Sequence, residues 1–381
     1  MNKLKSLIWL FMLANATIVS AQTKNSDSLI SQNIELNYQQ AKTMLVKQNL
    51  SLLANYYNVS IAQADLLQAK QWSNPYFNWN QDLYSNEQNK YFNLNNQRLV
   101  QIDQTIHIAG RHVNTVKLAK ITVEQAKMQL DDVLRGLILE LSEQYYALHA
   151  LQQKQTLYTE TLKRFEELIR NAEEKLSVGV LSSNEVLRLK SEQIAVKAEA
   201  NQNKNDILET LSQLRILLNL NENTNLKTIS QNASTQTDAL KIDELILAAI
   251  ENRPDYILGK SNIDYSKQNL RLQKSIAIPE MTLSYQPHDR GSNYVRPYQG
   301  FNVEASIPLF DRNQGGIASA KAKVKQAENQ QNQNENELRN QVQKAYLQLL
   351  NSKMGFQDFS NDFLQKIEEM NTNAVSNYKV Y

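Results

Sequence analysis

The fold of this chain is decided by residues 111–176, which read RHVNTVKLAKITVEQAKMQLDDVLRGLILELSEQYYALHALQQKQTLYTETLKRFEELIRNAEEKL. Apolar or small residues recur along this stretch at steps of three and four, from Val116 through Leu130 and Tyr145 to Leu176. Steps that average about 3.5 residues are typical of helices that supercoil left-handedly. Such a helix is roughly 100 Å long. Because no globular core is that long, the stretch predicts a helix packed along other helices in a tube or coiled coil.

The chain reverses direction directly after this helix. The reversal falls at 177–183 and contains Val178, Gly179, Val180, Leu181 and Ser182. Gly179 suits the left-handed conformation that ends a helix, and Ser182 or the serine after it can cap the next helix. The return helix is expected to end near residue 218. The stretch therefore predicts a helical hairpin with a short tip turn.

Four segments alternate apolar with polar residues, and this period of two predicts β-strands with one apolar and one polar face. They lie at about 76–84, 99–108, 280–286 and 300–309. Their lengths are close to that of a membrane β-strand, and the long polar loops between paired strands resemble the extracellular loops of an outer-membrane barrel. Two hairpins packed on a soluble helical body are the alternative, because a soluble sheet also has one apolar face.

The two halves of the chain follow one plan. Residues 48–75 align without a gap with residues 252–279, and each stretch is a helix followed by a proline-marked strand. Such a repeat is far too long for a solenoid period and indicates a duplicated half-protein. The predicted divisions are a signal peptide at 1–21, a first repeat at 22–220, a polar linker at 221–241 and a second repeat at 242–381.

The second repeat is expected to be shorter than the first. Its long helix is predicted from about residue 316 to residue 378, and no return helix follows it. An unpaired helix of this length would leave its apolar stripe exposed. We therefore expect a truncated second repeat, in preference to a natural chain that ends without its return helix.

The first residues predict export from the cytoplasm. Lys3 and Lys5 precede an apolar run at 7–14, and small residues at 19–21 provide a cleavage site before Gln22, which together are typical of a secretory signal peptide. The apolar run is too short to span a bilayer. No cysteine follows the cleavage site, so a lipid anchor there is excluded.

The composition excludes several classes of function. The 381 residues include 41 basic and 39 acidic residues and no cysteine. This balance gives no basic surface for nucleic acid, and the lack of cysteine excludes disulfides and thiolate metal sites. The four histidines, His107, His112, His149 and His288, have no metal-ligand spacing, and no phosphate loop or serine nucleophile motif occurs. We expect no enzyme activity, no catalytic residue, no cofactor and no metal site.

Two motifs mark the starts of helices in the second half. The first is Asn252-Arg253-Pro254-Asp255, in which Pro254 suits the first helical turn. The second runs from Ile307 to Ile317 and joins a strand to a helix. Pro308 removes a ladder donor, Asp311 or Asn313 can cap the helix, and Gly315-Gly316 lets backbones approach closely. The remaining motif residues are Phe310, Arg312 and Gln314.

These motifs, together with Val178-Gly179-Val180, Ser182 and Glu185 at the tip, resemble the outer-membrane efflux protein family, whose best-known member is TolC. The resemblance covers nearly all of the mature chain. The Phe-Asp-Arg-Asn-Gln-Gly form of the junction is typical of the CzcC and CusC type of metal-efflux protein.

The resemblance implies a mainly α protein with membrane β-strands. Three chains would form a homotrimer with a periplasmic α-barrel of long helices and a 12-stranded outer-membrane β-barrel, four strands coming from each chain. Four strands cannot close a barrel alone, and open edges are not tolerated in lipid.

The implied function is that of a passive duct in a tripartite efflux system, exporting metal ions or small toxic compounds. Its expected partners are a periplasmic adaptor (membrane fusion) protein, an inner-membrane pump of the RND or a similar type, and outer-membrane lipid, with no nucleic acid. Residues 178–182 would contact the adaptor, and Glu185 is a candidate gate residue.

A periplasmic coiled-coil adaptor or envelope tether is the alternative, since adaptors also have signal peptides and long helical hairpins. Adaptors usually carry small glycine-rich β-domains, however, and a repeat of this length is foreign to them. Outer-membrane fractionation and heat-modifiable migration would separate the two interpretations.

Overall fold

The computed structural model describes residues 33–81, 83–86, 89–91, 98–229, 241–290, 298–358, 365–366 and 369–370. Its elements, in chain order, are β1 (Asn33–Leu36), α2 (Tyr38–Gln48), α3 (Leu50–Ala69), β2 (Tyr76–Gln81), β3 (Tyr84–Ser85), β4 (Lys90–Tyr91), β5 (Arg98–Ile106), α4 (Arg111–Ser177), α5 (Ser183–Leu217), β6 (Asn225–Thr228), α6 (Ile242–Asn252), α7 (Pro254–Ile276), β7 (Met281–Arg290), β8 (Tyr298–Ala305) and α8 (Gln314–Asp358). The predicted signal peptide lies outside the described residues.

The chain forms two compact units. Unit 1 comprises Met1–Thr43 and Leu141–Gln231, and unit 2 comprises Met44–Glu140 and Asn232–Tyr381. These units differ from the predicted repeats because α4, a single helix of 67 residues, runs through both of them. The repeat remains a relation between two parts of the sequence and is not a division into compact bodies.

The helices confirm the predicted periodicity. The long helix predicted at 111–176 is α4, and the return helix is α5, which ends one residue before the predicted position. A break at Asn49 separates α2 from α3. There the Asn49 side chain, which is 4% exposed, accepts a hydrogen bond from the Leu52 backbone N–H at 2.9 Å and so caps α3.

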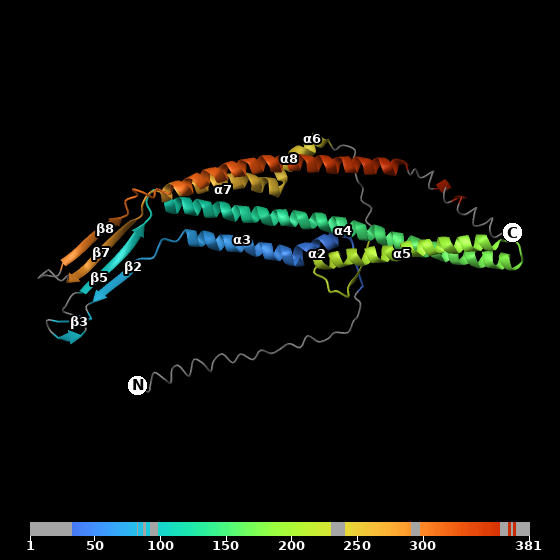
Figure 1. The fold of residues 1–381 in the computed structure, drawn as a ribbon, viewed down its shortest axis with the longest axis horizontal. Helices are drawn as coiled ribbons and strands as arrows, with labels where there is room; N and C mark the ends of the chain where they lie inside the picture. Colours follow the sequence, from blue (N-terminus) through green and yellow to red (C-terminus); the bar gives the residue numbers. More distant parts are fainter. Residues whose placement is uncertain are drawn as a thin grey trace, which may run out of the picture. The chain divides into compact units, whose positions relative to one another are not determined.

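Unit 1 contains α5 and the second part of α4 (Figure 1), together with a small parallel sheet. In this sheet β1 pairs with β6, with Ile34 opposite Leu226. The predicted linker at 221–241 is therefore corrected, since β6 lies within it. Tyr145 of α4 is 2% exposed, and its hydroxyl lies 2.9 Å from the carbonyl oxygens of both Leu36 and Ile229, at the ends of the two strands. This hydroxyl therefore links the β1–β6 pair to α4 by hydrogen bonds.

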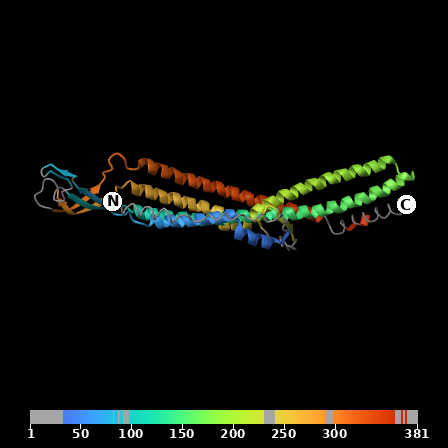
Figure 2. The same ribbon diagram turned by 90° about the horizontal axis from the view of Figure 1, so that it is seen from below.

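Unit 2 contains a four-stranded antiparallel sheet at one end of its helices (Figures 1 and 2). The strand order is β2-β5-β7-β8. The first strand ends at Gln81, earlier than predicted, and residues 84–85 instead pair with residues 90–91 in a separate hairpin. Strand β7 is longer than predicted and ends at Arg290.

The fourth strand is shorter at its end than the predicted 300–309. Strand β8 ends at Ala305, because Pro308 has no N–H to offer a neighbouring strand and its surroundings lie in a loop. Ile307 and Leu309, assigned to this strand by alternation, are exposed loop residues. The alternation therefore continued past the point where pairing stops.

Helix α7 begins at Pro254, which the sequence placed in its first turn. Helix α7 packs against α8, and α6 also contacts α8 (Figure 1). Helix α8 begins at Gln314, two residues before the predicted start, and its last described continuous residue is Asp358. Most of the predicted extension to residue 378 lies outside the described residues. Within the described part of the chain, no helix combines the length and the apolar character needed to cross a membrane.

Candidate functional site

The turn between α4 and α5 is built as its sequence predicts. Gly179 has φ +76°, the left-handed conformation, and the N–H of Val180 donates to the Lys175 carbonyl oxygen at 3.0 Å. Val178 and Val180 are 71% and 72% exposed. The tip therefore presents two apolar side chains on a hydrogen-bonded turn.

Glu185 helps to cap the start of α5 at this tip. Its carboxylate accepts hydrogen bonds at 3.0 Å from the backbone N–H and from the hydroxyl of Ser182, while its own N–H donates to the Ser182 hydroxyl at 3.4 Å. This reciprocal arrangement is a capping box. The bond from the Ser182 backbone, followed by that from its hydroxyl, lowers the pKa of Glu185. Of the two serines considered from the sequence, Ser182 is the cap.

The sheet of unit 2 separates apolar from polar side chains. In its register Phe77 lies opposite Ile102, Ile102 opposite Tyr285, and Tyr285 opposite Phe301, so one apolar row crosses all four strands. These side chains are exposed, Phe77 by 63% and Phe301 by 68%. A soluble sheet would bury such a face against a core. The exposure therefore marks this face as an interaction surface.

The opposite face of the sheet is polar. Asp103 lies opposite Tyr76 on one side and Ser284 on the other. The Gln101 side chain donates to Asp103 at 2.6 Å and accepts from the Gln286 side chain at 2.9 Å. Gln104 is the polar residue on the apolar face of β5, and its amide donates to the backbone carbonyl of Ser73 at 3.1 Å, next to the start of β2.

The junction before α8 differs from its predicted capping. Asp311 accepts a hydrogen bond from the Asn313 backbone N–H at 2.8 Å, so its carboxylate stabilises the turn and does not cap the helix. Asn313 occupies the cap position with φ +56°, but its amide donates across to α7, to the backbone carbonyl of Gln273 at 2.8 Å. Neither side-chain oxygen accepts a hydrogen bond from an N–H in the first turn of α8, and the positive φ of Asn313 differs from the extended backbone of a cap residue, so the expectation that Asp311 or Asn313 caps this helix is wrong.

Among the remaining motif residues of this junction, the hydrogen bonds of Gln314 are to near neighbours in the sequence. Gln314 donates to the Phe310 carbonyl at 2.9 Å and accepts from the Arg312 N–H at 2.8 Å. Phe310 is 91% exposed. Gly315 has open space around it, whereas a Cβ added at Gly316 would overlap with the Asn313 side chain. Of the two glycines, only Gly316 permits a close approach.

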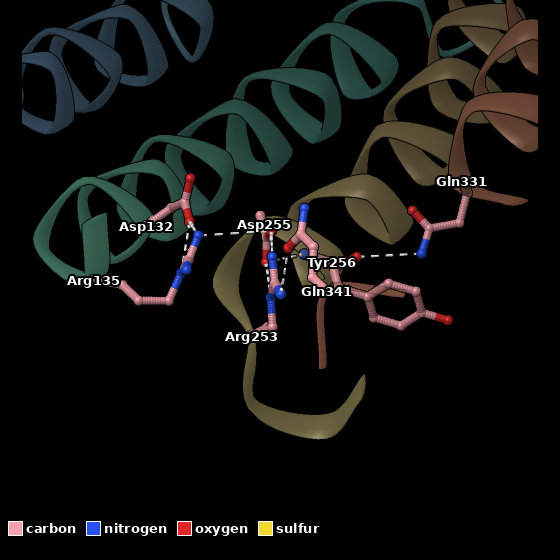
Figure 3. Close-up of polar contacts among 7 residues, drawn as sticks. All are labelled: Asp132, Arg135, Arg253, Asp255, Tyr256, Gln331 and Gln341. Atoms are coloured by element: carbon pink, nitrogen blue, oxygen red, sulfur yellow. Dashed lines mark hydrogen bonds and ion pairs between the residues drawn. The ribbon is translucent and has the colours of Figure 1, made fainter. Parts of the chain in front are cut away.

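A charged cluster surrounds the start of α7 (Figure 3). Arg253 precedes Pro254, the first residue of the helix, and its guanidinium binds both carboxylate oxygens of Asp255. It also donates to the Gln341 side chain of α8 at 2.9 Å. Arg135 of α4, which pairs with Asp132, lies 3.7 Å from Asp255. The cluster thus links three helices of unit 2.

The electrostatics of this cluster follow from its geometry. Burial alone would raise the pKa of Asp255, but the hydrogen bonds from Arg253 and the charges of Arg253 and Arg135 outweigh it, so this pKa is lowered. The hydrogen bond to Asp255 raises the pKa of Arg253. From the sequence, Asn252-Arg253-Pro254-Asp255 was predicted only to start a helix. The distant partners Arg135 and Gln341 carry no local signal that would have revealed them.

His107, His112 and His149 each have different neighbours. His107 lies 3.4 Å from Glu280, which also pairs with Arg111, and the ring of His112 stacks on Trp72 with centroids 4.4 Å apart. His149 lies 3.0 Å from the Thr228 hydroxyl. Among the described residues, no group of three or more potential ligand side chains gathers around a possible metal position.

A known protein family matches most of this chain. Residues 41–220 and 245–357, more than half of the chain, match the family described as outer membrane efflux protein. No curated protein matches the chain significantly.

Several solved structures share its fold. A membrane protein from Pseudomonas aeruginosa has a TM-score of 0.67 at 14% identity, over 89% of this chain and 82% of its own. The CmeC outer membrane channel of Campylobacter jejuni has a TM-score of 0.70 at 14% identity, over 89% and 76%. CusC, whose structures concern transmembrane channel formation, has a TM-score of 0.63 at 15% identity, over 90% and 82%.

At these identities the structures establish likeness of fold, and the family match carries the assignment. The mainly helical fold with few strands is that of TolC-like channels, and members of this family are outer-membrane channels that extend into the periplasm, not enzymes. The chain belongs to the outer membrane efflux protein family.

Proposed function

We propose that this chain is the channel subunit of a tripartite efflux system that exports metal ions or small toxic compounds. The observation that carries the proposal is the exposed apolar row across β2, β5, β7 and β8, backed by a polar face. In this proposal the apolar row faces outer-membrane lipid and the polar face lines water. The channel is a passive duct, and an inner-membrane pump of the RND or a similar type supplies the energy.

The proposed assembly is a homotrimer. Strands β2 and β8 are the edges of the sheet within this chain, and an open edge is unstable in lipid because its backbone groups lack partners. Pairing β8 of one copy with β2 of the next would close a 12-stranded barrel. Outer-membrane fractionation combined with heat-modifiable migration tests this. A folded, fast-migrating species that shifts on boiling supports the barrel, and a periplasmic, heat-insensitive protein contradicts it.

The proposed adaptor contact is the tip turn, residues 178–182. Its support is the exposure of Val178 and Val180 on a fixed turn, which gives the hairpin tip of a periplasmic adaptor an apolar surface. Photo-crosslinking from position 180 in cells tests the contact. We expect adaptor adducts from this position and none from Arg188 of α5, whose side chain is 83% exposed. Equal labelling at both positions would remove the tip from the interface.

A gate role for Glu185 would be additional to its capping box, which already accounts for its position. The two roles separate by substitution. Glu185→Gln keeps a side chain that can complete a capping box but removes the charge. If Glu185 also gates the channel, this variant leaks small solutes while the trimer stays intact. If conductance is unchanged in the variant, Glu185 is a cap and nothing more.

The exported cargo is proposed from the junction motif and from the likeness to CusC in fold. Deleting the protein should raise sensitivity to the exported compounds alone. Growth on graded copper, silver, zinc and cobalt, compared with growth on dyes and detergents, tests this. Selective metal sensitivity favours metal export, and sensitivity to the organic compounds alone favours small toxic compounds.

A further inference from the structure

Two contacts along the α7–α8 pair share an unusual composition, each joining a glycine of one helix to a carboxamide of the other. At the first, Gly259 of α7 is buried, and a Cβ added there would overlap with the side-chain oxygen of Gln331. Gln331 of α8 is 8% exposed, and its amide donates to the backbone carbonyl of Tyr256 at 3.3 Å. Its side-chain oxygen has no hydrogen-bond partner among the described residues and lies against the glycine.

The second contact reverses the roles of the helices. Gly316 belongs to α8, and a Cβ added there would lie 2.8 Å from the side-chain oxygen of Gln273 on α7. The same added atom would overlap with the oxygen of Asn313, whose amide donates to the carbonyl oxygen and side-chain oxygen of Gln273 at 2.8 and 2.9 Å. In both contacts a carboxamide from the α8 side donates to a backbone carbonyl of α7, and the glycine beside it belongs to α7 in the first contact and to α8 in the second.

The two contacts lie about four helical turns apart on each helix, or roughly 20 Å. We propose that they form a two-point register lock that fixes the axial position of α8 on α7. An apolar seam permits a helix to slip by one turn, because one aliphatic side chain can replace another. A buried carboxamide specifies position, because it needs both a partner for its amide and a glycine to make room.

The lock has a consequence for the sheet. Strand β7 follows α7 directly, and β8 precedes α8, so the axial position of the helices bears on the pairing of the strands. A slip of one helical turn moves α8 by about 5.4 Å, which is more than one residue of a strand. Where residues 306–313 do not take up this movement, it shifts the pairing of Leu283 with Val303, and a shift of one residue there turns side chains to the wrong face. Gly259, Gln331, Gly316, Gln273 and Asn313 are therefore positioning residues for the β7–β8 hairpin.

This lock also relates two motifs that the channel function does not explain. The Arg253–Asp255 cluster stands at the start of α7, near the first contact, and the junction around Asn313 stands at the start of α8, within the second. Both motifs therefore mark the ends of one antiparallel pair. The proposal does not depend on the cargo or on the partners of the channel.

Substitution of the glycines tests the lock by stability. Alanine has a higher helix propensity than glycine, so an open glycine should gain stability on replacement. Gly259→Ala should instead lower Tm by roughly 2–4 °C, and Gln331→Ala in the same chain should remove the added effect of the alanine. Gly315→Ala is the matched control, since nothing lies within 4 Å of its added Cβ, and it should not lower Tm.

Cysteine crosslinking reads the register itself, because the natural chain has no cysteine. Asn262 and Ala327 line one cavity of about 310 Å³ between the helices, each one turn from the Gly259–Gln331 contact. With Asn262→Cys fixed, second cysteines at 323, 327 or 334 should crosslink most at 327, and Gly259→Ala should flatten this preference. No preference in the unaltered seam, or equal Tm for Gly259→Ala and Gly315→Ala, overturns the lock.

Discussion

Replacing Asp255 by asparagine tests whether the cluster at the start of α7 holds three helices together. The carboxylate accepts two bonds from Arg253 and one from the Tyr256 N–H at 2.9 Å, and Arg135 lies 3.7 Å away. Hydrogen bonds to charged groups contribute about 1.5–3 kcal/mol. The Asp255 side chain is 35% exposed, which weakens the charge term by solvent screening. We therefore expect Asp255→Asn to lower the free energy of unfolding by about 1–2 kcal/mol at pH 7.

The stability difference between wild type and Asp255→Asn should depend on pH. The pKa of Asp255 is lower in the folded protein than in the unfolded chain, so the ionised form favours folding. This stabilisation is present above the unfolded pKa of about 3.9 and is lost as the pH falls through the folded value. The difference between wild type and Asp255→Asn should therefore be full at pH 7 and shrink below pH 4.

The assay is urea unfolding of the purified protein in detergent, followed by far-ultraviolet circular dichroism at pH 7 and at pH 3.5. Asp264→Asn is the matched control, because Asp264 is an exposed carboxylate on the same helix. It should change stability little at either pH. An Asp255→Asn effect no larger than that of the control, or one that is the same at both pH values, would refute the reasoning.

Three further changes probe other parts of the structure. Tyr145→Phe should destabilise unit 1 by about 0.5–1.5 kcal/mol, because the Ile229 carbonyl loses the hydroxyl donor while the Leu36 carbonyl keeps the Ile229 N–H at 3.1 Å; hydrogen exchange should rise in β1 and β6, and unchanged exchange would contradict the role of the hydroxyl. Gly179→Val should impair export while leaving the trimer intact, because a β-branched residue resists the φ of +76° at the tip. Gly179→Asn is its control, since asparagine tolerates this conformation; transport assays with native gels measure both, and normal export by the valine variant would count against the tip. Phe77→Ser should weaken membrane assembly more than Asn78→Ser, because only Phe77 belongs to the exposed apolar row; equal yields of assembled protein would argue against a functional difference between the faces.

Periodic and local signals predicted a large part of this fold. The 67 residues of α4 carry a repeat that specifies helix at every turn, and Gly179 and Ser182 have local chemistry that marks the hairpin tip. The alternation of Phe77, Ile102, Tyr285 and Phe301 predicted which residues share a sheet face, and the register confirms it. Each of these features is encoded within a few residues of its position.

The features that the sequence did not reveal depend on distant partners. Strand β6 has four residues in a polar segment, and its partner β1 lies nearly the whole first half of the chain away, so no local pattern predicts their pairing. Asp255 has an adjacent partner in Arg253, but its approach to Arg135 depends on how α4 and α7 pack. Asn313 has the residue type of a helix cap, yet its amide binds Gln273 on another helix. Residue type alone could not decide between these partners.

The central claim is that the sheet of unit 2 places one face in outer-membrane lipid. Val303 lies on the apolar face, 48% exposed, and the adjacent Asn302 lies on the polar face. An arginine facing lipid near the bilayer midplane costs about 2–4 kcal/mol, whereas an arginine facing water does not carry that cost. The most direct measurement is the yield of heat-modifiable trimer in outer-membrane fractions for Val303→Arg and Asn302→Arg. We expect Val303→Arg to lose most of the trimer while Asn302→Arg assembles normally; equal assembly of the two variants would show that neither face of the sheet meets lipid.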